Sequence, residues 1–307
     1  MSLKKIHETA EKIRKLKERK NAIIIAHNYQ KPEIQDIADL VADSLEMARK
    51  AAESDADIIV VCGVTFMAET AKILNPDRKV LIPDLGKICT MAEMLTPNDI
   101  KEAKRKYKDA EVALYVNSTA TCKALADVCV TSANAAEIVN KLNSDTVIFA
   151  PDKNLAHYVS KRTDRRIINI PKHGVCPVHH MLCKNDVLQV KSLHKNAKVV
   201  AHPECKPEVQ EIADHIASTE GMVKYCSESE HNEFIICTEE GLLYKLSKRC
   251  PDKRFHLASK YLVCSSMKIT NLKILRECLE REKYEIKLDK TTIKNAQEAI
   301  NRMLELA

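Results

Sequence analysis

Three of the twelve cysteines recur at one position of a repeated segment, where together they could bind a metal centre. They are Cys89, Cys176 and Cys264, which are 87 and 88 residues apart. No fourth cysteine stands at an equivalent position, so the set describes a metal site that is one protein ligand short. A [4Fe–4S] cluster held by three cysteines keeps one iron free to bind a substrate oxygen or nitrogen as a Lewis acid. The spacing therefore predicts a cluster of this kind.

Zinc is the competing metal. Structural zinc sites are usually built from closely paired cysteines or histidines, and the chain contains no CxxC pair. The stretch CPVHHMLC could still form a local zinc site from Cys176, Cys183 and either His179 or His180. Most of the other cysteines have no counterpart in the other repeats and are expected to be buried. Simple packing is the alternative explanation for the three recurring thiols as well.

Each repeat begins with an apolar run that ends at a polar ring. The three rings, 88 and 87 residues apart, are His27, Tyr115 and His202. Two residues further on, and on the same side of an extended strand end, are Tyr29, Asn117 and Glu204. A lone histidine at such a place is usually a packed core residue, but three equivalent pairs indicate a shared cavity. Glu204 is the only carboxylate among them, which makes it the candidate for proton transfer.

A hydroxyl group follows each ring by 17 residues. These hydroxyls belong to Ser44, Ser132 and Thr219. Each is expected to cap the start of a helix, with Asp43 as the alternative cap in the first repeat. Helix N-termini also favour anions, so three converging caps could hold carboxylate or phosphate groups. We therefore expect these hydroxyls to contact a ligand.

The segments around these residues alternate between strand and helix patterns. In the first repeat, strands are expected at residues 21–28, 56–63 and 79–83, and helices at 4–20, 32–40, 44–52 and 66–74. This order is typical of parallel βαβ connections, in which ligands collect beyond the carboxyl ends of the strands. The predicted fold class is α/β, with three repeated three-layer αβα domains that have parallel sheets. We expect them to meet about a pseudo-threefold axis, with the active site at the centre.

The repeat divides the chain into three predicted domains at residues 1–88, 89–175 and 176–269. Each unit is small for an independent core, so the three are expected to pack on one another. After Cys264 the helix-then-strand pattern that opens a unit appears again without a further unit. Residues 270–307 are therefore expected to pack back on the first domain and close the ring.

Composition excludes several other classes of protein. Of 307 residues, 45% are hydrophobic and 30% are charged, which is typical of a globular chain. The net charge of +6 is spread along the sequence, so no nucleic acid partner is expected. The most basic stretch, residues 4–20, fits a solvated amphipathic helix. No apolar run approaches the length of a membrane span and no signal peptide is evident, so we expect a cytoplasmic protein without membrane association.

Several blocks of the sequence resemble one known family. They are AHNYQKPEIQDIADLVADSLEMARKA, YVNSTATCKALADVCVTS, CPVH, HPECKPEV and CSSMK. The blocks are similar to those of quinolinate synthases, the A protein of de novo NAD biosynthesis, and the resemblance covers nearly the whole chain. It implies three αβα domains around a pseudo-threefold axis and one [4Fe–4S] cluster with three cysteine ligands. The implied reaction condenses iminoaspartate (iminosuccinate) with dihydroxyacetone phosphate to give quinolinate, phosphate and water.

Carried over position by position, the resemblance implies a role for each candidate. The cluster ligands would be Cys89, Cys176 and Cys264. The substrate-binding residues would be His27, Ser44, Tyr115, Asn117, Ser132, His202, Glu204 and Thr219. The catalytic residues would be Tyr29 as a mobile aromatic group, Glu204 as acid and base, Tyr115 and His202. The family often has asparagine where this chain has Ser266, which leaves the alignment of Cys264 unchanged. An aspartate-oxidising enzyme could supply the imine.

Two other interpretations stay open at this point. The diphthamide-forming radical enzyme that cleaves S-adenosylmethionine also has three α/β domains with one cysteine each, but it lacks the AHNYQ and HPE blocks. A non-catalytic iron–sulfur or zinc redox sensor would need four protein ligands and no small-molecule pocket. Binding of quinolinate would separate both from the first interpretation.

Overall fold

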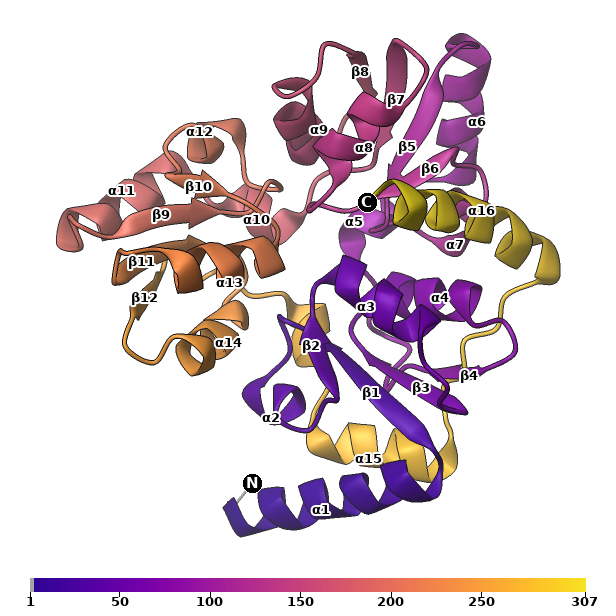
Figure 1. The fold of residues 1–307 in the computed structure, drawn as a ribbon, viewed down its shortest axis with the longest axis vertical. Coiled ribbons are helices and arrows are strands. Elements are labelled where there is room, and N and C mark those ends of the chain that lie inside the picture. Colours follow the sequence, from indigo (N-terminus) through magenta and orange to yellow (C-terminus); the bar gives the residue numbers. More distant parts are fainter. Residues whose placement is uncertain (1–2) are drawn as a thin grey trace.

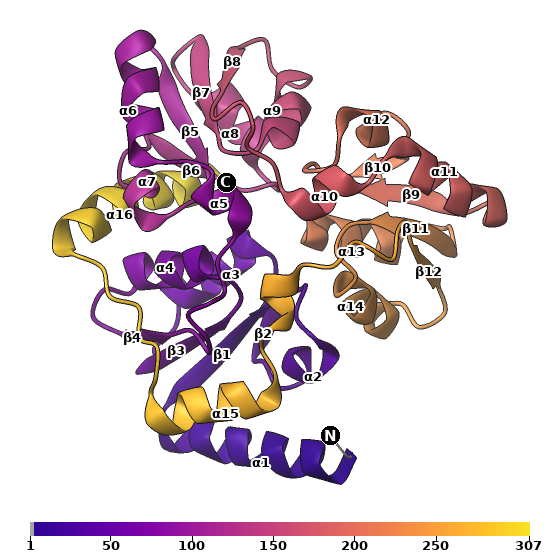
Figure 2. The same ribbon diagram turned by 180° about the vertical axis from the view of Figure 1, so that it is seen from behind.

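The computed structural model describes residues 3–307, and side chains from residue 5 onward. Three four-stranded sheets, one in each repeat, form three lobes around a common centre (Figures 1 and 2). All strand pairs within the sheets are parallel, and helices flank each sheet. The predicted α/β class with three repeated αβα units is confirmed.

The elements repeat in the same order along the chain. The first unit contains α1 (Leu3–Arg19), β1 (Ala22–His27), α2 (Pro32–Gln35), β2 (Leu40–Ala42), α3 (Ser44–Ala52), β3 (Ile58–Cys62), α4 (Thr65–Leu74) and β4 (Lys79–Leu81). The second contains α5 (Thr90–Glu93), α6 (Pro97–Lys106), β5 (Glu111–Tyr115), α7 (Ala120–Lys123), β6 (Val128–Val130), α8 (Ala135–Lys141), β7 (Thr146–Ala150), α9 (Lys153–Ser160) and β8 (Arg166–Asn169).

The third unit has the same succession and leads into the C-terminal helices. It contains α10 (Pro177–Met181), α11 (Lys184–Leu193), β9 (Lys198–Ala201), α12 (Pro207–Gln210), β10 (His215–Ile216), α13 (Thr219–Glu228), β11 (Glu233–Cys237), α14 (Leu242–Arg249) and β12 (Arg254–Leu257). A 3-10 turn, η1 (Ser265–Lys268), α15 (Leu272–Arg281) and α16 (Lys290–Leu306) follow.

The three sheets share one strand order. It is β2-β1-β3-β4 in the first unit, β6-β5-β7-β8 in the second and β10-β9-β11-β12 in the third. Every residue of β3 is buried, which is typical of a parallel strand covered by helices on both faces. In all three sheets the carboxyl ends of the central strands point towards the centre of the molecule (Figure 1).

The helix expected over residues 32–40 is wrong in its second half. Helix α2 ends at Gln35, and residues 40–42 form the edge strand β2, which pairs with β1. Asp39 fixes this turn, because its backbone N–H donates to the Ile24 carbonyl and its side chain accepts from the Ile24 N–H, both at 2.8 Å. Asp127 and Asp214 make the same pair of bonds in the other units. The aspartate therefore ends the helical segment and pairs the following residues with the central strand.

Of the expected helix caps, only the alternative Asp43 is confirmed. Asp43 caps α3 and accepts hydrogen bonds from two N–H groups, while Ser218 caps α13. Ser44 and Thr219 are instead the first helical residues. In the second unit the cap position is Asn134, two residues after Ser132. The three hydroxyls are thus free of the capping role.

The C-terminal helices return to the first half of the chain. Helix α15 packs on α1, as Figure 2 shows. Helix α16 contacts α4 of the first unit and both α7 and β6 of the second, and it buries Ala296, Ala299, Ile300 and Met303. In residues 3–307 no helix combines the length and the apolar character needed to cross a membrane.

Candidate functional site

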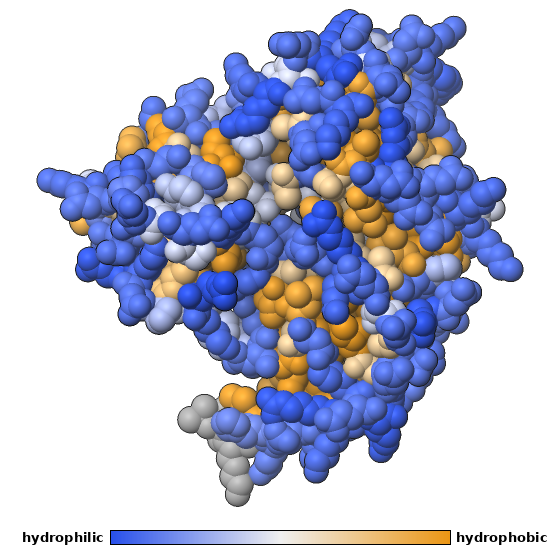
Figure 3. Space-filling view, viewed as in Figure 1, coloured by the Kyte–Doolittle hydropathy of each residue, from blue (hydrophilic) through white to orange (hydrophobic). Residues whose placement is uncertain are grey.

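The ring residues lie where the central strands end. His27 and Tyr115 are the last residues of β1 and β5, and His202 directly follows β9. A cavity of about 310 Å³ occupies this centre. It is lined by every residue that the sequence predicted for the site: His27, Tyr29, Ser44, Cys89, Tyr115, Asn117, Ser132, Cys176, His202, Glu204, Thr219 and Cys264. The outer face around it is mostly hydrophilic, with apolar side chains showing in the grooves between polar elements (Figure 3).

The three cysteines have equivalent local structures. Cys89 precedes α5, Cys176 precedes α10 and Cys264 precedes η1, and all three are half-buried. Backbone N–H groups of the following turn approach each sulfur atom. Burial raises the pKa of the Cys89 thiol to about 12 and also raises the pKa of Cys176 and Cys264. Three such thiols can be thiolates only beside a strongly positive group, so the donor set fits an iron–sulfur cluster.

One backbone hydrogen bond positions each cysteine loop. A carbonyl two residues before the cysteine accepts from an N–H at the start of the neighbouring helix. The three bonds, each 2.9 Å long, join Thr65 N to Lys87 O, Lys153 N to Gly174 O, and Glu240 N to Leu262 O. The donors are 88 and 87 residues apart, so the bond follows the register of the repeat.

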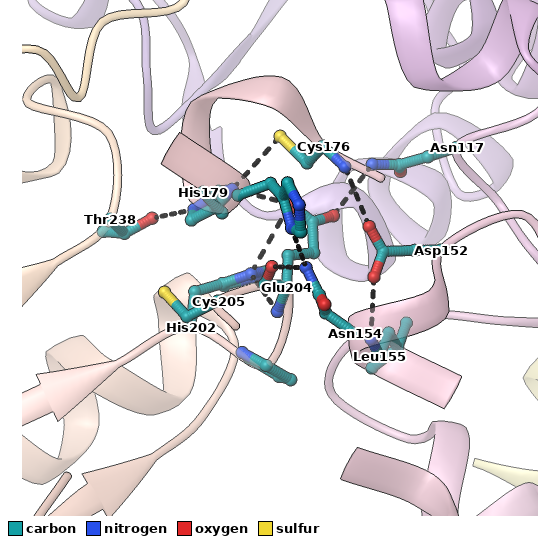
Figure 4. A network of polar contacts seen from close by, with 12 residues as sticks. Asn117, Asp152, Asn154, Leu155, Cys176, His179, His202, Glu204, Cys205 and Thr238 are labelled. Atoms are coloured by element: carbon teal, nitrogen blue, oxygen red, sulfur yellow. Dashed lines mark hydrogen bonds and ion pairs between the residues drawn. The ribbon is translucent and has the colours of Figure 1, made fainter. Parts of the chain in front are cut away.

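Glu204 is the hub of a polar network inside the cavity (Figure 4). Tyr115 donates its hydroxyl proton to Oε1 over 2.7 Å, and His179 Nδ1 lies 2.8 Å from Oε2. The other ring nitrogen of His179 is 2.8 Å from the Thr238 hydroxyl, which is 2.6 Å from the Tyr29 hydroxyl. A continuous chain of exchangeable protons therefore links residues of all three units.

The network holds one buried negative charge. Burial opposes ionisation of Glu204, but its pKa lies below the usual range because His202 and His179 are close and because His179 and Tyr115 donate hydrogen bonds to it. Burial, together with the charge of Glu204, raises the pKa of Asp152 to about 8. Burial also lowers the pKa of His27 and of His202 to about 3. The cavity thus presents a carboxylate beside two neutral imidazoles.

Several residues of the site had not been singled out for substrate chemistry. His179 had been considered only as a zinc ligand. Thr238 was missed because the equivalent residues of the other two units are Gly63 and Pro151, so no polar residue recurs at this position. Asn28, which donates to the Thr219 hydroxyl over 2.8 Å, was also missed. Their common signal is adjacency in sequence to a repeated strand end or to a recurring cysteine.

The structure brings together only part of the local zinc alternative. His179 Nδ1 lies 3.2 Å from the Cys176 sulfur, and Glu204, rather than Cys183, completes a group that could hold a metal ion. Neither Cys183 nor His180 lines the cavity. The Cys183 thiol donates to Asp186 over 2.9 Å at the start of α11, and His180 is 3.2 Å from the Asn154 amide. Eight further cysteines, none of which recurs in all three units, are buried, as expected: Cys62, Cys122, Cys129, Cys205, Cys226, Cys237, Cys250 and Cys278.

Comparison with known proteins gives a consistent result over the whole chain. A family model described as "Quinolinate synthetase A protein" matches residues 11–305. A quinolinate synthase of Pyrococcus horikoshii is 54% identical over 300 residues, which cover 98% of this chain and 99% of that protein. The quinolinate synthase of Thermococcus kodakarensis is 54% identical over 297 residues, covering 97% and 98%. That of Methanocaldococcus jannaschii is 51% identical over 304 residues, covering 97% and 99%.

Proposed function

The chain belongs to the quinolinate synthetase A protein family, and from this premise we propose that it condenses iminoaspartate with dihydroxyacetone phosphate to give quinolinate, phosphate and water. One observation carries the proposal. Side chains from three sheets, predicted from a common register, line a single cavity that contains three thiols and a buried carboxylate. Its volume of about 310 Å³ suits molecules the size of the two substrates.

The thiolates of Cys89, Cys176 and Cys264 would hold a [4Fe–4S] cluster. When bound, the cluster supplies an open iron that acts as a Lewis acid on a substrate C–O bond without a change of oxidation state. The N–H groups of the turns that follow the cysteines stabilise the negative sulfur atoms. The protein would thereby supply three ligands to the cluster.

Hydroxyl and imidazole groups would bind the substrate carboxylates. Ser44 and Thr219 begin helices whose N-termini favour anions, and Ser132 lines the same cavity. Neutral His27 and His202 can each donate an N–H without adding charge. Because these groups are buried, bulk water is largely excluded, which protects an imine from hydrolysis. An aspartate-oxidising enzyme is the kind of partner that would supply this imine.

Glu204 would move protons during the condensation. Its ionised carboxylate can accept a proton from a substrate carbon at Oε2, beside His179, while Tyr115 keeps donating to Oε1. The proton can then leave through His179 towards Thr238, or return to a departing hydroxyl group as water forms. Tyr29, at the end of this chain, would contact the reacting carbons.

Removal of the cysteines tests the cluster. Cys89→Ala, Cys176→Ala and Cys264→Ala should each abolish both cluster and quinolinate formation. The protein is purified without oxygen, its iron is counted, and quinolinate is assayed from the two substrates. A colourless triple variant that still makes quinolinate would overturn the proposal.

Glu204→Gln separates the proton-transfer role from the cluster. The amide keeps the shape but cannot take up a proton, so turnover should fall about 10²- to 10⁴-fold while iron content stays normal. Turnover close to that of the unchanged protein would remove Glu204 from the mechanism.

A further inference from the structure

A second group of potential metal ligands lies in the third unit, outside the central cavity. His194 is the C-cap of α11, Glu233 is the first residue of β11, and His256 lies on the neighbouring strand β12. None of the three lines the cavity, which is at the opposite, carboxyl end of this sheet. The group therefore has no part in the chemistry described above.

The geometry brings the three side chains to one point. Glu233 Oε1 lies 3.1 Å from His194 Nδ1 and 2.9 Å from His256 Nε2. One ligand atom from each residue lies within 4.8 Å of the other two. The side chains are 31%, 18% and 25% exposed in the order His194, Glu233, His256, so an ion and its water could reach them.

The repeat provides an internal control for this group. In the second unit the C-cap of α6 is Tyr107, the first residue of β7 is Thr146, and the residue equivalent to His256 is Ile168. In the first unit the two strand positions hold Ile58 and Leu81. The same scaffold thus forms twice without these ligands, so their presence in the third unit is not a requirement of the fold.

Two imidazole nitrogens and one carboxylate oxygen are a preferred donor set for zinc, which often leaves a fourth position to water. We propose that His194, Glu233 and His256 bind a divalent transition-metal ion of the zinc class. The imidazole rings now stack with centroids 3.5 Å apart, so each turns about its side-chain bonds to aim a lone pair at the ion. Their partial exposure permits this rotation. The C-terminal end of α11 adds a favourable dipole for a cation.

The bound ion would brace the end of α11 against β11 and β12. It would replace hydrogen bonds between three half-exposed side chains by three metal–ligand bonds, and each imidazole would keep its remaining N–H on the other ring nitrogen. Because the metal binds the folded unit, zinc should raise the melting temperature. This stabilisation is independent of the central reaction.

Exchange of residues between repeats tests the site. Zinc binding is measured by equilibrium dialysis on the cluster-loaded protein, without oxygen, for the unchanged chain and for His194→Tyr, Glu233→Thr and His256→Ile, which copy the second unit. The unchanged protein should bind one zinc ion beyond its cluster iron and melt at a higher temperature with zinc. Each exchange should weaken zinc binding by about tenfold or more and abolish the thermal shift. His231→Ala, which removes an exposed histidine near Glu233, should bind zinc normally.

Three outcomes would overturn the proposal. One is no zinc binding by the unchanged protein at saturating zinc. Another is equal binding by the exchanged variants, or an equal loss in His231→Ala, which would put the ion elsewhere. The last is zinc uptake matched by loss of iron, which would assign the ion to the cysteine cavity. Iron is therefore counted in the same samples.

Discussion

The cysteine loop of the first unit and those of the second and third share a backbone bond but differ in their side-chain support. In the second unit the buried carboxyl of Asp152 accepts from the N–H of Cys176 over 2.9 Å. Glu239, at the equivalent position of the third unit, accepts from the N–H of Cys264 over 3.1 Å. The first unit has Val64 at this place, which offers no acceptor.

The residue two places before each cysteine differs as well. It is Gly174 in the second unit and Leu262, in an apolar cluster, in the third. In the first unit it is Lys87, which is fully buried and donates to the hydroxyl of Thr270 in the returning C-terminal segment. The strand order and one backbone hydrogen bond therefore position the sulfur atoms in all three units, while side-chain support has diverged between the copies. Four substitutions test this interpretation.

The largest effect is expected from Gly174→Ala. An added Cβ would lie 1.9 Å from the Pro151 carbonyl oxygen, so the loop has to move away from β7 and take Cys176 with it. We expect a loss of at least about 3 kcal/mol of unfolding free energy and a lower iron content. Denaturant unfolding and an iron count provide the measurements. Gly86→Ala is the matched control, because the exposed loop glycine of the first unit meets only the end of the Asp84 side chain.

Asp152→Ala should have the next largest effect. It leaves two buried donors, the N–H groups of Leu155 and Cys176, without their acceptor. The expected cost is about 2 to 3 kcal/mol, with faster loss of iron to a chelator. Asp152→Asn retains one acceptor oxygen, so its stability and its rate of iron loss should lie between those of the unchanged protein and those of Asp152→Ala. An unchanged stability and iron-release rate in the alanine variant would show that the carboxyl does not support the loop.

Glu239→Gln should reduce the unfolding free energy by a smaller amount. The amide keeps one oxygen for either Cys264 or Gly241, but it loses the ion pair with Lys268, whose Nζ lies 2.8 Å from the carboxylate. We expect a loss of about 1 to 2 kcal/mol in denaturant unfolding. Glu240→Gln serves as control, because that half-exposed carboxylate is 3.6 Å from the same amine and should matter little. Equal effects of the two substitutions would contradict a specific role for Glu239.

The same divergence decides which residues of the site could be predicted from the sequence alone. Residues such as Cys89 and Ser132 were identified because the repeat preserves their type and offset, and parallel strands bring equal offsets to one edge. The edge strand at Leu40 was missed, since a three-residue strand leaves no periodic signal and depends on the clamp by Asp39. The supports Asp152 and Lys87 were missed for the opposite reason. They differ between units, so no register marked them, and only packing reveals their partners.

The smallest effect is expected from Lys87→Leu, which gives the first loop the residue of the third. Burial lowers the pKa of the Lys87 amine, and this amine has a hydroxyl rather than a carboxylate as its bonded partner. Replacing a poorly compensated buried amine by an apolar group of similar length is often neutral, so unfolding free energy should change by less than about 1 kcal/mol. The backbone bond from Thr65 to the carbonyl of residue 87 is unaffected by the side chain, so iron content should also persist. A loss above about 2 kcal/mol, measured beside the Asp152 variants, would mean that the first loop too depends on a buried polar group.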